Sequence, residues 1–111
     1  VGSEMCIRDR YKIIKTRLAE QDLDNILGYI VFSLANPSAA ASFADAVEAC
    51  YSDLEKMPLM YELCRDPRLR ALEYHKAVIK NFIMVYKVDE AAKTVHILRF
   101  FYGRQDYEKL I

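Results

Sequence analysis

The clearest indication of the fold comes from KTVHILRFFYGRQDYEKL, residues 93–110. Its first part, from Thr94 to Tyr102, is rich in β-branched, aromatic and aliphatic side chains, and this composition predicts a strand. Apolar side chains occupy both alternating faces of the strand, so we expect it to be central in a sheet and covered on both sides. Gly103 is predicted to end the strand, and the polar residues that follow have a helical composition.

One arginine, Arg99, lies inside this apolar run. Burying a guanidinium group without partners is costly, so we expect Arg99 to reach a pocket, a carboxylate or a ligand. A pair with Asp106, which would fix the C-terminal segment to the sheet, has about the same weight as a functional role for the two residues. Arg104 lies where the strand opens into a turn and has no comparable structural explanation, so it is the strongest functional candidate.

The N-terminal part of the chain predicts a short strand followed by a helix. Residues 11–16 form the strand, and Thr16 is suited to cap the helix. Acidic residues such as Asp22 lie near the helix start, where the helix dipole favours negative charge. Gly28 predicts a close approach of another helix. The apolar face of this helix is formed by Leu23, Ile26, Leu27, Ile30 and Leu34.

Asn36 and Pro37 mark the start of a second helix, as its N-cap and its first helical residue. This helix is predicted to end near Lys56 and to lie antiparallel to the first, because the link between them is short. Its predicted buried stripe consists of Ala40, Phe43, Val47, Cys50, Tyr51 and Leu54.

The rest of the chain predicts a loop and three strands. Pro58 ends the second helix, and the loop continues to Arg68. The predicted strands are residues 69–75, 77–88 and 93–102, with a four-residue turn at 89–92 between the last two. The order β-α-α-β-β-β indicates an α+β fold, with one sheet face packed on the helix hairpin. The other face is the natural place for a groove.

Length and composition predict a single domain over residues 11–111 of the 111-residue chain. Residues 1–10, VGSEMCIRDR, do not fit this pattern, and we interpret them as a leader outside the fold. The three cysteines lack the spacing of a zinc site or a disulfide framework, so we expect reduced thiols. There is no apolar run of membrane-spanning length and no secretory leader, which predicts a soluble, cytoplasmic protein.

The net charge is zero, but the charge is unevenly distributed. Residues 1–64 contain six Lys and Arg against ten Asp and Glu, and residues 65–111 contain ten against six. A basic C-terminal half indicates an anionic partner, such as a nucleic acid or an acidic peptide. Attraction between the two halves of the chain explains the same pattern equally well.

The chain resembles the RelE/ParE superfamily of toxins from bacterial type II toxin–antitoxin systems. The resemblance rests on AEQDLDNILGYI (19–30), NFIMVYKVDE (81–90) and VHILRFFYGRQDYEKLI (95–111). Family members often have an Ile-Leu-Arg strand followed by a His-Gly-Arg-Arg-Asp turn. Here Arg99, Gly103, Arg104 and Asp106 match that pattern, whereas Tyr102 replaces the histidine and Gln105 the second arginine.

The resemblance implies a RelE-like fold and a role in growth inhibition and plasmid stabilization, with two alternative activities. RelE-like members cleave messenger RNA on the ribosome, and ParE-like members inhibit DNA gyrase. The ribosome-dependent nucleases often carry an arginine in the long hairpin strand, where this chain has Ile83. This difference slightly favours the ParE-like activity, while an endoribonuclease and a non-toxic binding member remain alternatives.

An endoribonuclease needs a general base, cations for the phosphate and a general acid, but neither metal nor cofactor. The catalytic candidates are Arg104, Lys80, Arg99 and Tyr102. The candidates for binding RNA or another target are Arg70, Arg68, Arg104 and Tyr107. Arg65, Arg68 and Arg70 form a basic run that is slightly better explained as a solvated surface.

Two histidines and one tyrosine complete the predictions. His96 is expected in the core, and His75 is expected at a solvated turn beside Lys76. Tyr86 is expected to pack in a core strand, with its hydroxyl group bonded to a partner.

The resemblance also implies a partner. A small antitoxin is expected to wrap around the domain with a helix and an extended segment, and to cover the basic groove. The targets would be DNA gyrase or the ribosome with its messenger RNA. The toxin alone is not expected to read DNA directly or to bind a membrane.

Overall fold

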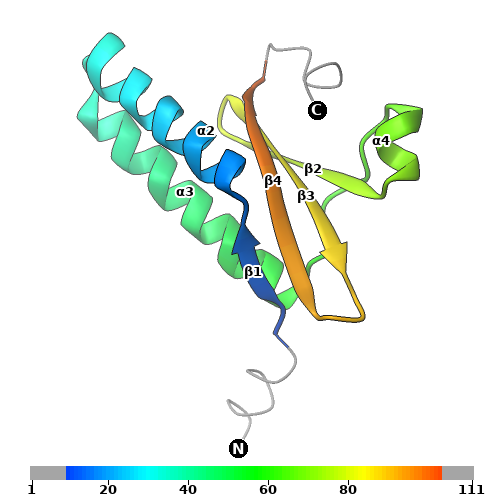
Figure 1. The fold of residues 1–111 in the computed structure, drawn as a ribbon. Coiled ribbons are helices and arrows are strands. Elements are labelled where there is room, and N and C mark those ends of the chain that lie inside the picture. The colour runs from blue at the N-terminus through cyan, green and yellow to red at the C-terminus, as the bar shows by residue number, and fades with distance from the viewer. Residues whose placement is uncertain (1–9, 104–111) are drawn as a thin grey trace, which may run out of the picture.

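The computed structural model describes residues 10–103, which form a four-stranded sheet and a pair of long helices (Figure 1). The strands are β1 (Lys12–Lys15), β2 (Tyr74–Ile79), β3 (Phe82–Asp89) and β4 (Thr94–Tyr102). Their order in the sheet is β1-β4-β3-β2, with β1 parallel to β4 and the other neighbours antiparallel. The predicted α+β fold is therefore confirmed, and β4 has the predicted central position.

The helical segments are α2 (Arg17–Gly28), the π-helical turn η1 (Tyr29–Ser33), α3 (Pro37–Lys56) and the short α4 (Pro67–Ala71). The backbone N–H of Ala19 donates to Thr16 Oγ1 at 3.1 Å, and that of Ala39 donates to Asn36 Oδ1 at 3.1 Å. Both predicted N-caps are thus confirmed. Helices α2 and α3 lie side by side as the predicted hairpin (Figure 1).

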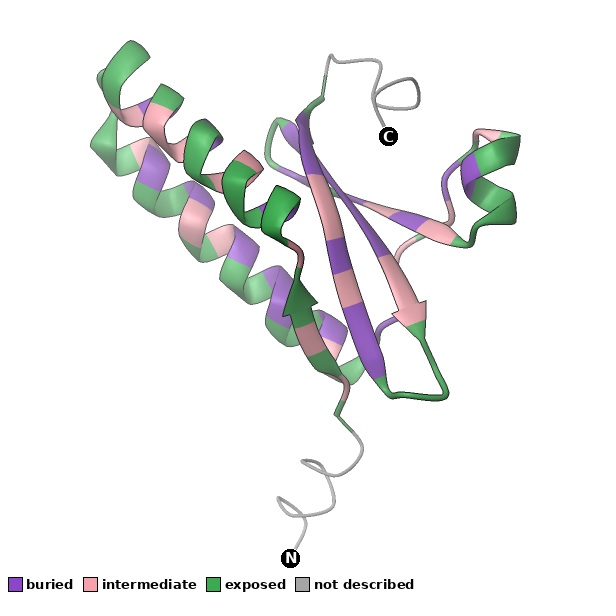
Figure 2. Ribbon diagram, in the orientation of Figure 1, coloured by how far each residue is buried: buried purple, intermediate pink, exposed green. Residues whose placement is uncertain are grey.

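Two apolar clusters cover the two faces of the sheet. The central strands β3 and β4 are accordingly buried or half-buried along most of their length (Figure 2). The larger cluster joins α2 and α3 to the sheet, and it includes Phe43, Val47, Leu54, Met84, Tyr86 and Ile97. The smaller cluster lies on the opposite face under α4 and consists of Cys64, Leu69, Ile83, Val85 and Phe101. Strands β3 and β4 contribute to both clusters, as expected for strands whose apolar residues point to both faces.

The predicted strand over residues 69–75 is wrong. Residues 67–71 form α4, because Asp66 caps this turn by accepting hydrogen bonds from the backbone N–H groups of Arg68 and Leu69, at 2.9 and 3.2 Å. Pro67 suits the first helical position, and buried Leu69 anchors the turn to the smaller cluster. The sequence interpretation treated Pro67 only as a breaker and missed its role in starting a helix.

The predicted long strand over residues 77–88 is two strands. Its first residues belong to β2, and the chain reverses at Lys80 and Asn81 before β3 begins. Lys80 has φ 56°, a left-handed conformation that is uncommon for a residue other than glycine. The turn was missed because it has neither glycine nor proline and interrupts an otherwise apolar run.

The end of the first helix also differs from its prediction. The backbone N–H of Leu34 donates to the carbonyl of Tyr29 at 3.1 Å, which inserts an extra residue into the turn. This shift leaves the side chain of Leu34 exposed instead of on the buried face. The expected close approach at Gly28 is also wrong, since a Cβ atom built there would meet nothing within 4 Å. Within residues 10–103, no helix is long and apolar enough to cross a membrane.

Candidate functional site

One end of the β3–β4 hairpin brings together two of the predicted site residues. Lys80 lies in the turn before β3, and Tyr102 pairs with Phe82 at the end of β4. The backbone N–H of Gly103 donates to the carbonyl of Asn81 at 2.8 Å, which ties the end of β4 to this turn. We call the residues Lys80, Asn81, Phe82, Tyr102 and Gly103 the pinned end of the hairpin.

Gly103 allows the two backbones to meet at the pinned end. A Cβ atom on Gly103 would lie 2.9 Å from the carbonyl oxygen of Asn81, closer than side-chain carbons approach a backbone oxygen. Glycine is therefore required here by close approach, while its φ is not in the left-handed region. The turn before β3 and Gly103, at the end of β4, are held together as a result.

Tyr102 contacts other aromatic rings at the pinned end. Its ring centroid lies 5.2 Å from that of Phe82 and 5.9 Å, edge to face, from that of Tyr29. Partial burial, followed by the nearby Tyr29 phenol, raises the pKa of Tyr102. The Tyr102 phenol therefore stays protonated near neutral pH, as a hydrogen-bond donor at the edge of the sheet.

Arg99 binds a carboxylate, as expected, and the carboxylate is that of Asp22 in α2. Arg99 Nε donates to Asp22 Oδ2 at 2.6 Å, and Nη2 donates to Oδ1 at 3.2 Å. The hydrogen bond to Asp22 is the main cause of a raised Arg99 pKa. The alternative partner, Asp106, lies outside the described residues. This contact joins the acidic and basic halves of the chain and is the only ion pair found within residues 10–103.

Asp22 also accepts a hydrogen bond from the edge of β4, at the point where β1 no longer pairs with it. Strand β1 pairs with β4 only as far as Ile97, so the following edge of β4 has no strand partner from β1. Thr16 Oγ1 donates to the carbonyl of Leu98 at 3.0 Å, and the N–H of Phe100 donates to Asp22 Oδ2 at 3.1 Å. This role was not predicted from the sequence, because the position of Asp22 near the helix start was explained by the helix dipole.

The arginines of the predicted binding surface lie elsewhere. Arg68 and Arg70 belong to α4, which precedes β2, whereas Lys80 follows the other end of β2. Both side chains are exposed because α4 buries Leu69. Arg104 and Tyr107 lie outside the described residues. Within the described part of the chain, Lys80 and Tyr102 are thus together at the pinned end, and Arg68 and Arg70 form a separate group.

Neither histidine has the environment that was predicted for it. His75 is 7% exposed, and its ring stacks on Tyr86 with centroids 4.9 Å apart. Its Nδ1 lies 2.9 Å from the carbonyl oxygen of Tyr61. His96 is instead only half-buried. The expected partner of the Tyr86 hydroxyl group is confirmed, since this group donates to the carbonyl of Pro58 at 2.9 Å.

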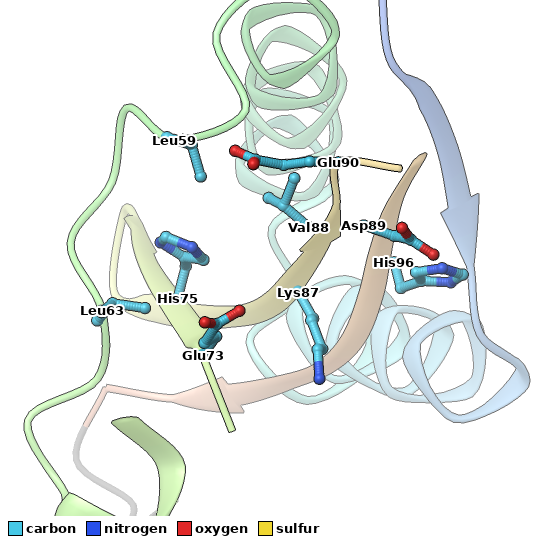
Figure 3. Close-up of a pocket in the computed structure, with 9 residues that line it drawn as sticks. All are labelled: Leu59, Leu63, Glu73, His75, Lys87, Val88, Asp89, Glu90 and His96. Carbon is cyan, nitrogen blue, oxygen red and sulfur yellow. The ribbon is translucent and has the colours of Figure 1, made fainter. Parts of the chain in front are cut away.

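His75 and His96 both line a hollow at the opposite end of the hairpin from the pinned end (Figure 3). This hollow, which we call the hairpin hollow, has a volume of about 630 Å³. The loop after α3, the start of β2 and the β3–β4 turn supply its walls. Its lining residues are Leu59, Leu63, Glu73, His75, Lys87, Val88, Asp89, Glu90 and His96.

The charge of the hairpin hollow is opposite to that of the predicted groove. Three carboxylates and one lysine line it, and none of the predicted cationic residues that the structure describes is among them. Sequence reasoning missed Glu73 and Glu90 because they lie in turns within the basic half of the chain. In residues 10–103, no group of three or more His, Cys, Asp or Glu side chains is placed to hold a metal ion.

Comparison with solved structures finds the same fold in two toxin–antitoxin systems. One is the toxin–antitoxin complex RelBE2 from Mycobacterium tuberculosis, with 23% identity, a TM-score of 0.60, and coverage of 84% of this chain and 98% of the other. The second is a chromosomal ParDE system from P. aeruginosa, with 19% identity, a TM-score of 0.65, and coverage of 85% and 97%. No curated protein matches the sequence significantly.

The family described as the ParE toxin of the type II toxin–antitoxin system parDE matches residues 13–107, which is most of the chain. The match includes the helix hairpin, all of β2 to β4 and both ends of the β3–β4 hairpin. The chain therefore belongs to the ParE toxin family of type II toxin–antitoxin systems.

Proposed function

We propose that this toxin arrests bacterial growth by binding DNA gyrase, and that it does so without cleaving RNA. The observation that carries this proposal is the environment of Ile83. This residue is 7% exposed and packs in the smaller apolar cluster with Leu69 and Phe101. It occupies the position where RelE-like nucleases often carry an arginine, so an apolar contact replaces a phosphate-binding cation here.

The state of Arg99 supports the same proposal. Its guanidinium group is bound on two nitrogens by Asp22, and the same carboxylate accepts the N–H of Phe100. The guanidinium keeps its charge, but the carboxylate compensates it, so the pair attracts a phosphate only weakly. A protein–protein contact needs no such free cation, which favours inhibition by binding.

A second candidate function is messenger RNA cleavage on the ribosome, and the pinned end favours it. Lys80 and Tyr102 lie at the same end of the sheet. Lys80 is exposed, and Tyr102 carries a partly exposed phenol. A lysine and a protonated phenol are suited to neutralise a phosphate and to donate a proton.

The two functions separate in one experiment. The protein is induced in a bacterium while DNA replication and messenger RNA integrity are followed side by side, and purified protein is added to gyrase supercoiling reactions. We expect replication and supercoiling to stop while messenger RNA stays intact. Normal supercoiling with excess toxin would contradict the proposal. Loss of messenger RNA that Lys80→Ala abolishes would favour the nuclease, and unaffected growth would indicate a non-toxic member.

We also propose a cognate antitoxin as the partner of this chain, and the cytoplasm as the place where the toxin acts. The two structures with the same fold are described as a toxin–antitoxin complex and a ParDE system. Exposed cations on α4 and at the pinned end provide surface for an acidic antitoxin segment. Co-expression tests this proposal. The antitoxin should restore growth and purify with the toxin, and an antitoxin that does neither would contradict it.

A further inference from the structure

The hairpin hollow combines an apolar wall with acidic groups (Figure 3). Leu59 and Leu63 come from the loop after α3, and Val88 comes from the end of β3. Glu73 precedes β2, and Glu90 lies in the β3–β4 turn. An apolar wall beside carboxylates matches a side chain that has an aliphatic stem and a cationic head.

Among the charged groups of the hollow, Lys87 already contacts an aromatic ring, whereas two of the carboxylates form no ion pair with a described residue. Lys87 Nζ lies 6.0 Å from the ring centroid of Tyr74, so this cation contacts an aromatic face. Asp89 Oδ1 accepts a hydrogen bond from the backbone N–H of Ala92 at 3.1 Å and so stabilises the β3–β4 turn. Glu73 and Glu90 form no ion pair with any residue that the structure describes. The hollow therefore has an uncompensated negative charge.

His75 adds a hydrogen-bond acceptor to the hollow. A carbonyl oxygen can only accept, so the 2.9 Å contact with Tyr61 requires that His75 Nδ1 carries the proton. In the neutral ring, Nε2 then has a free lone pair. The residue is 7% exposed, no hydrogen bond to its Nε2 is found within residues 10–103, and this atom is not fully buried. A donor entering the hollow would satisfy this atom.

The walls of the hollow are held in place by the fold. The Tyr86 hydroxyl group fixes the loop through Pro58, and two backbone hydrogen bonds join the loop to β2. These bonds run from Cys64 N to Tyr74 O at 2.8 Å and from Lys76 N to Glu62 O at 3.0 Å. A preformed site binds with less loss of conformational entropy than a flexible one.

We propose that the hairpin hollow binds an arginine side chain of the cognate antitoxin. The aliphatic stem lies against Leu59, Leu63 and Val88. The guanidinium group donates to Glu73, Glu90 and the Nε2 atom of His75, and its planar array of donors suits three separate acceptors. This inference rests on the proposed antitoxin partner, and it assigns to that partner a basic contact in addition to any acidic one.

The first test measures the chemistry of the hollow without the antitoxin. The full-length toxin is titrated with acetyl-Leu-Arg-amide and, separately, with acetyl-Leu-citrulline-amide, while NMR shifts are recorded. Citrulline has nearly the same shape as arginine but no charge. We expect the arginine peptide alone to shift the amide signals of Glu73 and Glu90 and the ring signals of His75. Equal shifts with both peptides, or none with either, would overturn the proposal.

The second test identifies the source of the arginine. Binding of the antitoxin to the double variant Glu73→Gln/Glu90→Gln is compared with its binding to Asp45→Asn/Glu48→Gln. The control removes two exposed carboxylates of α3 that do not line the hollow. We expect the hollow variant to bind about tenfold more weakly and the control to bind normally. Equal melting temperatures of the two variants establish that both are folded.

Two further outcomes would overturn the proposal. Antitoxin binding that is unchanged in the hollow variant would exclude the antitoxin as the occupant, even if the arginine peptide binds. Self-association of the toxin that the hollow variant abolishes would indicate a second copy of this chain as the occupant. Growth arrest is measured in parallel. A toxin that loses antitoxin binding while it still stops growth separates this inference from the proposed action on gyrase.

Discussion

The two ends of the β3–β4 hairpin use charged groups in opposite ways. Near the pinned end, the Asp22 carboxylate is consumed within the fold, where it binds Arg99 and the N–H of Phe100. At the hairpin hollow, the carboxylates of Glu73 and Glu90 form no ion pair with a described residue, although Lys87 lines the same hollow. An arginine in an apolar strand can thus have a structural role, while acidic residues in turns form a site that is more accessible to a partner.

The comparison also bears on the uneven charge of the sequence. The ion pair between Asp22 and Arg99 is the attraction between the two halves of the chain that the sequence allowed as an explanation. The basic half, however, also supplies the acidic residues of the hollow. Charge summed over a long segment therefore does not predict the charge of a surface, because the fold distributes neighbouring residues to different faces.

The substitution Asp22→Ala should have the largest effect on stability. It leaves the half-buried Arg99 and the N–H of Phe100 without their acceptor, so the free energy of unfolding should fall by about 2–3 kcal/mol. Urea denaturation measures the change, and Asp24→Ala, an exposed acidic residue on the same helix, is the control. A loss equal to that of the control would show that the ion pair is not structural.

Gly103→Ala tests the contact at the pinned end. The added methyl group would lie 2.9 Å from the carbonyl oxygen of Asn81, and relieving this overlap requires that the turn or the end of β4 moves. We expect the free energy of unfolding to fall by about 1–2 kcal/mol. Thermal or urea unfolding measures it, and an unchanged value would mean that the two backbones separate without cost.

Alkaline pH tests how much Tyr61, whose carbonyl oxygen contacts His75 of the hairpin hollow, contributes to the free energy of unfolding. Burial, and then its hydrogen bond with Cys50, raise the pKa of Tyr61 to about 12. The phenol ionises near pH 10 in the unfolded chain, so the unfolded state loses a proton first and stability falls as the pH rises from 10 to 12. We expect Tyr61 to account for about 1 kcal/mol of this loss, because solvent still reaches part of the ring.

Urea unfolding at pH 9 and pH 12 measures the effect, and Tyr61→Phe should reduce the decrease between them. A decrease of the same size in the variant would assign the pH dependence to other tyrosines, such as Tyr51 and Tyr86. Burial raises the pKa of both.

Gly28→Ala should have the smallest effect on the free energy of unfolding. It contrasts with Gly103→Ala because its added methyl group meets no other atom. Gly28 has helical backbone angles, and a Cβ atom there meets nothing within 4 Å. Alanine should raise the free energy of unfolding by about 0.5 kcal/mol, since it restricts the unfolded chain and favours the helix. A destabilising effect would indicate that the helix needs flexibility where α2 meets the π-helical turn.

Much of the fold was predictable because it depends on local signals. Thr16, Asn36 and Pro37 mark the starts of α2 and α3 by capping chemistry, which acts over three or four residues. The apolar composition of β4 likewise indicated a central strand. The errors arose where local signals were weak or ambiguous, as at the glycine-free turn of Lys80 and at Pro67, which can end one element or begin another.

The candidate site was less predictable. The sequence predicted His75 in solvent and His96 in the core. His75 is instead buried, because β2 begins at Tyr74 and directs His75 toward Tyr86, and His96 is only half-buried. One misplaced turn changes which side chains face inward, since neighbouring residues of a strand point to opposite faces. The predicted roles of Arg104 and Tyr107 remain predictions, as both lie outside the described residues.

Residue types and their spacing were enough to indicate the starts of α2 and α3, the central position of β4 and the resemblance to a toxin family. Each of these depends on the types and spacing of residues close together in the chain. Only the tertiary structure decided that Asp22, 77 residues before Arg99, neutralises its charge, and that Glu73 and Glu90 share a hollow with His75. Contacts between distant segments depend on how strands and helices pack, and residue spacing alone does not specify that arrangement.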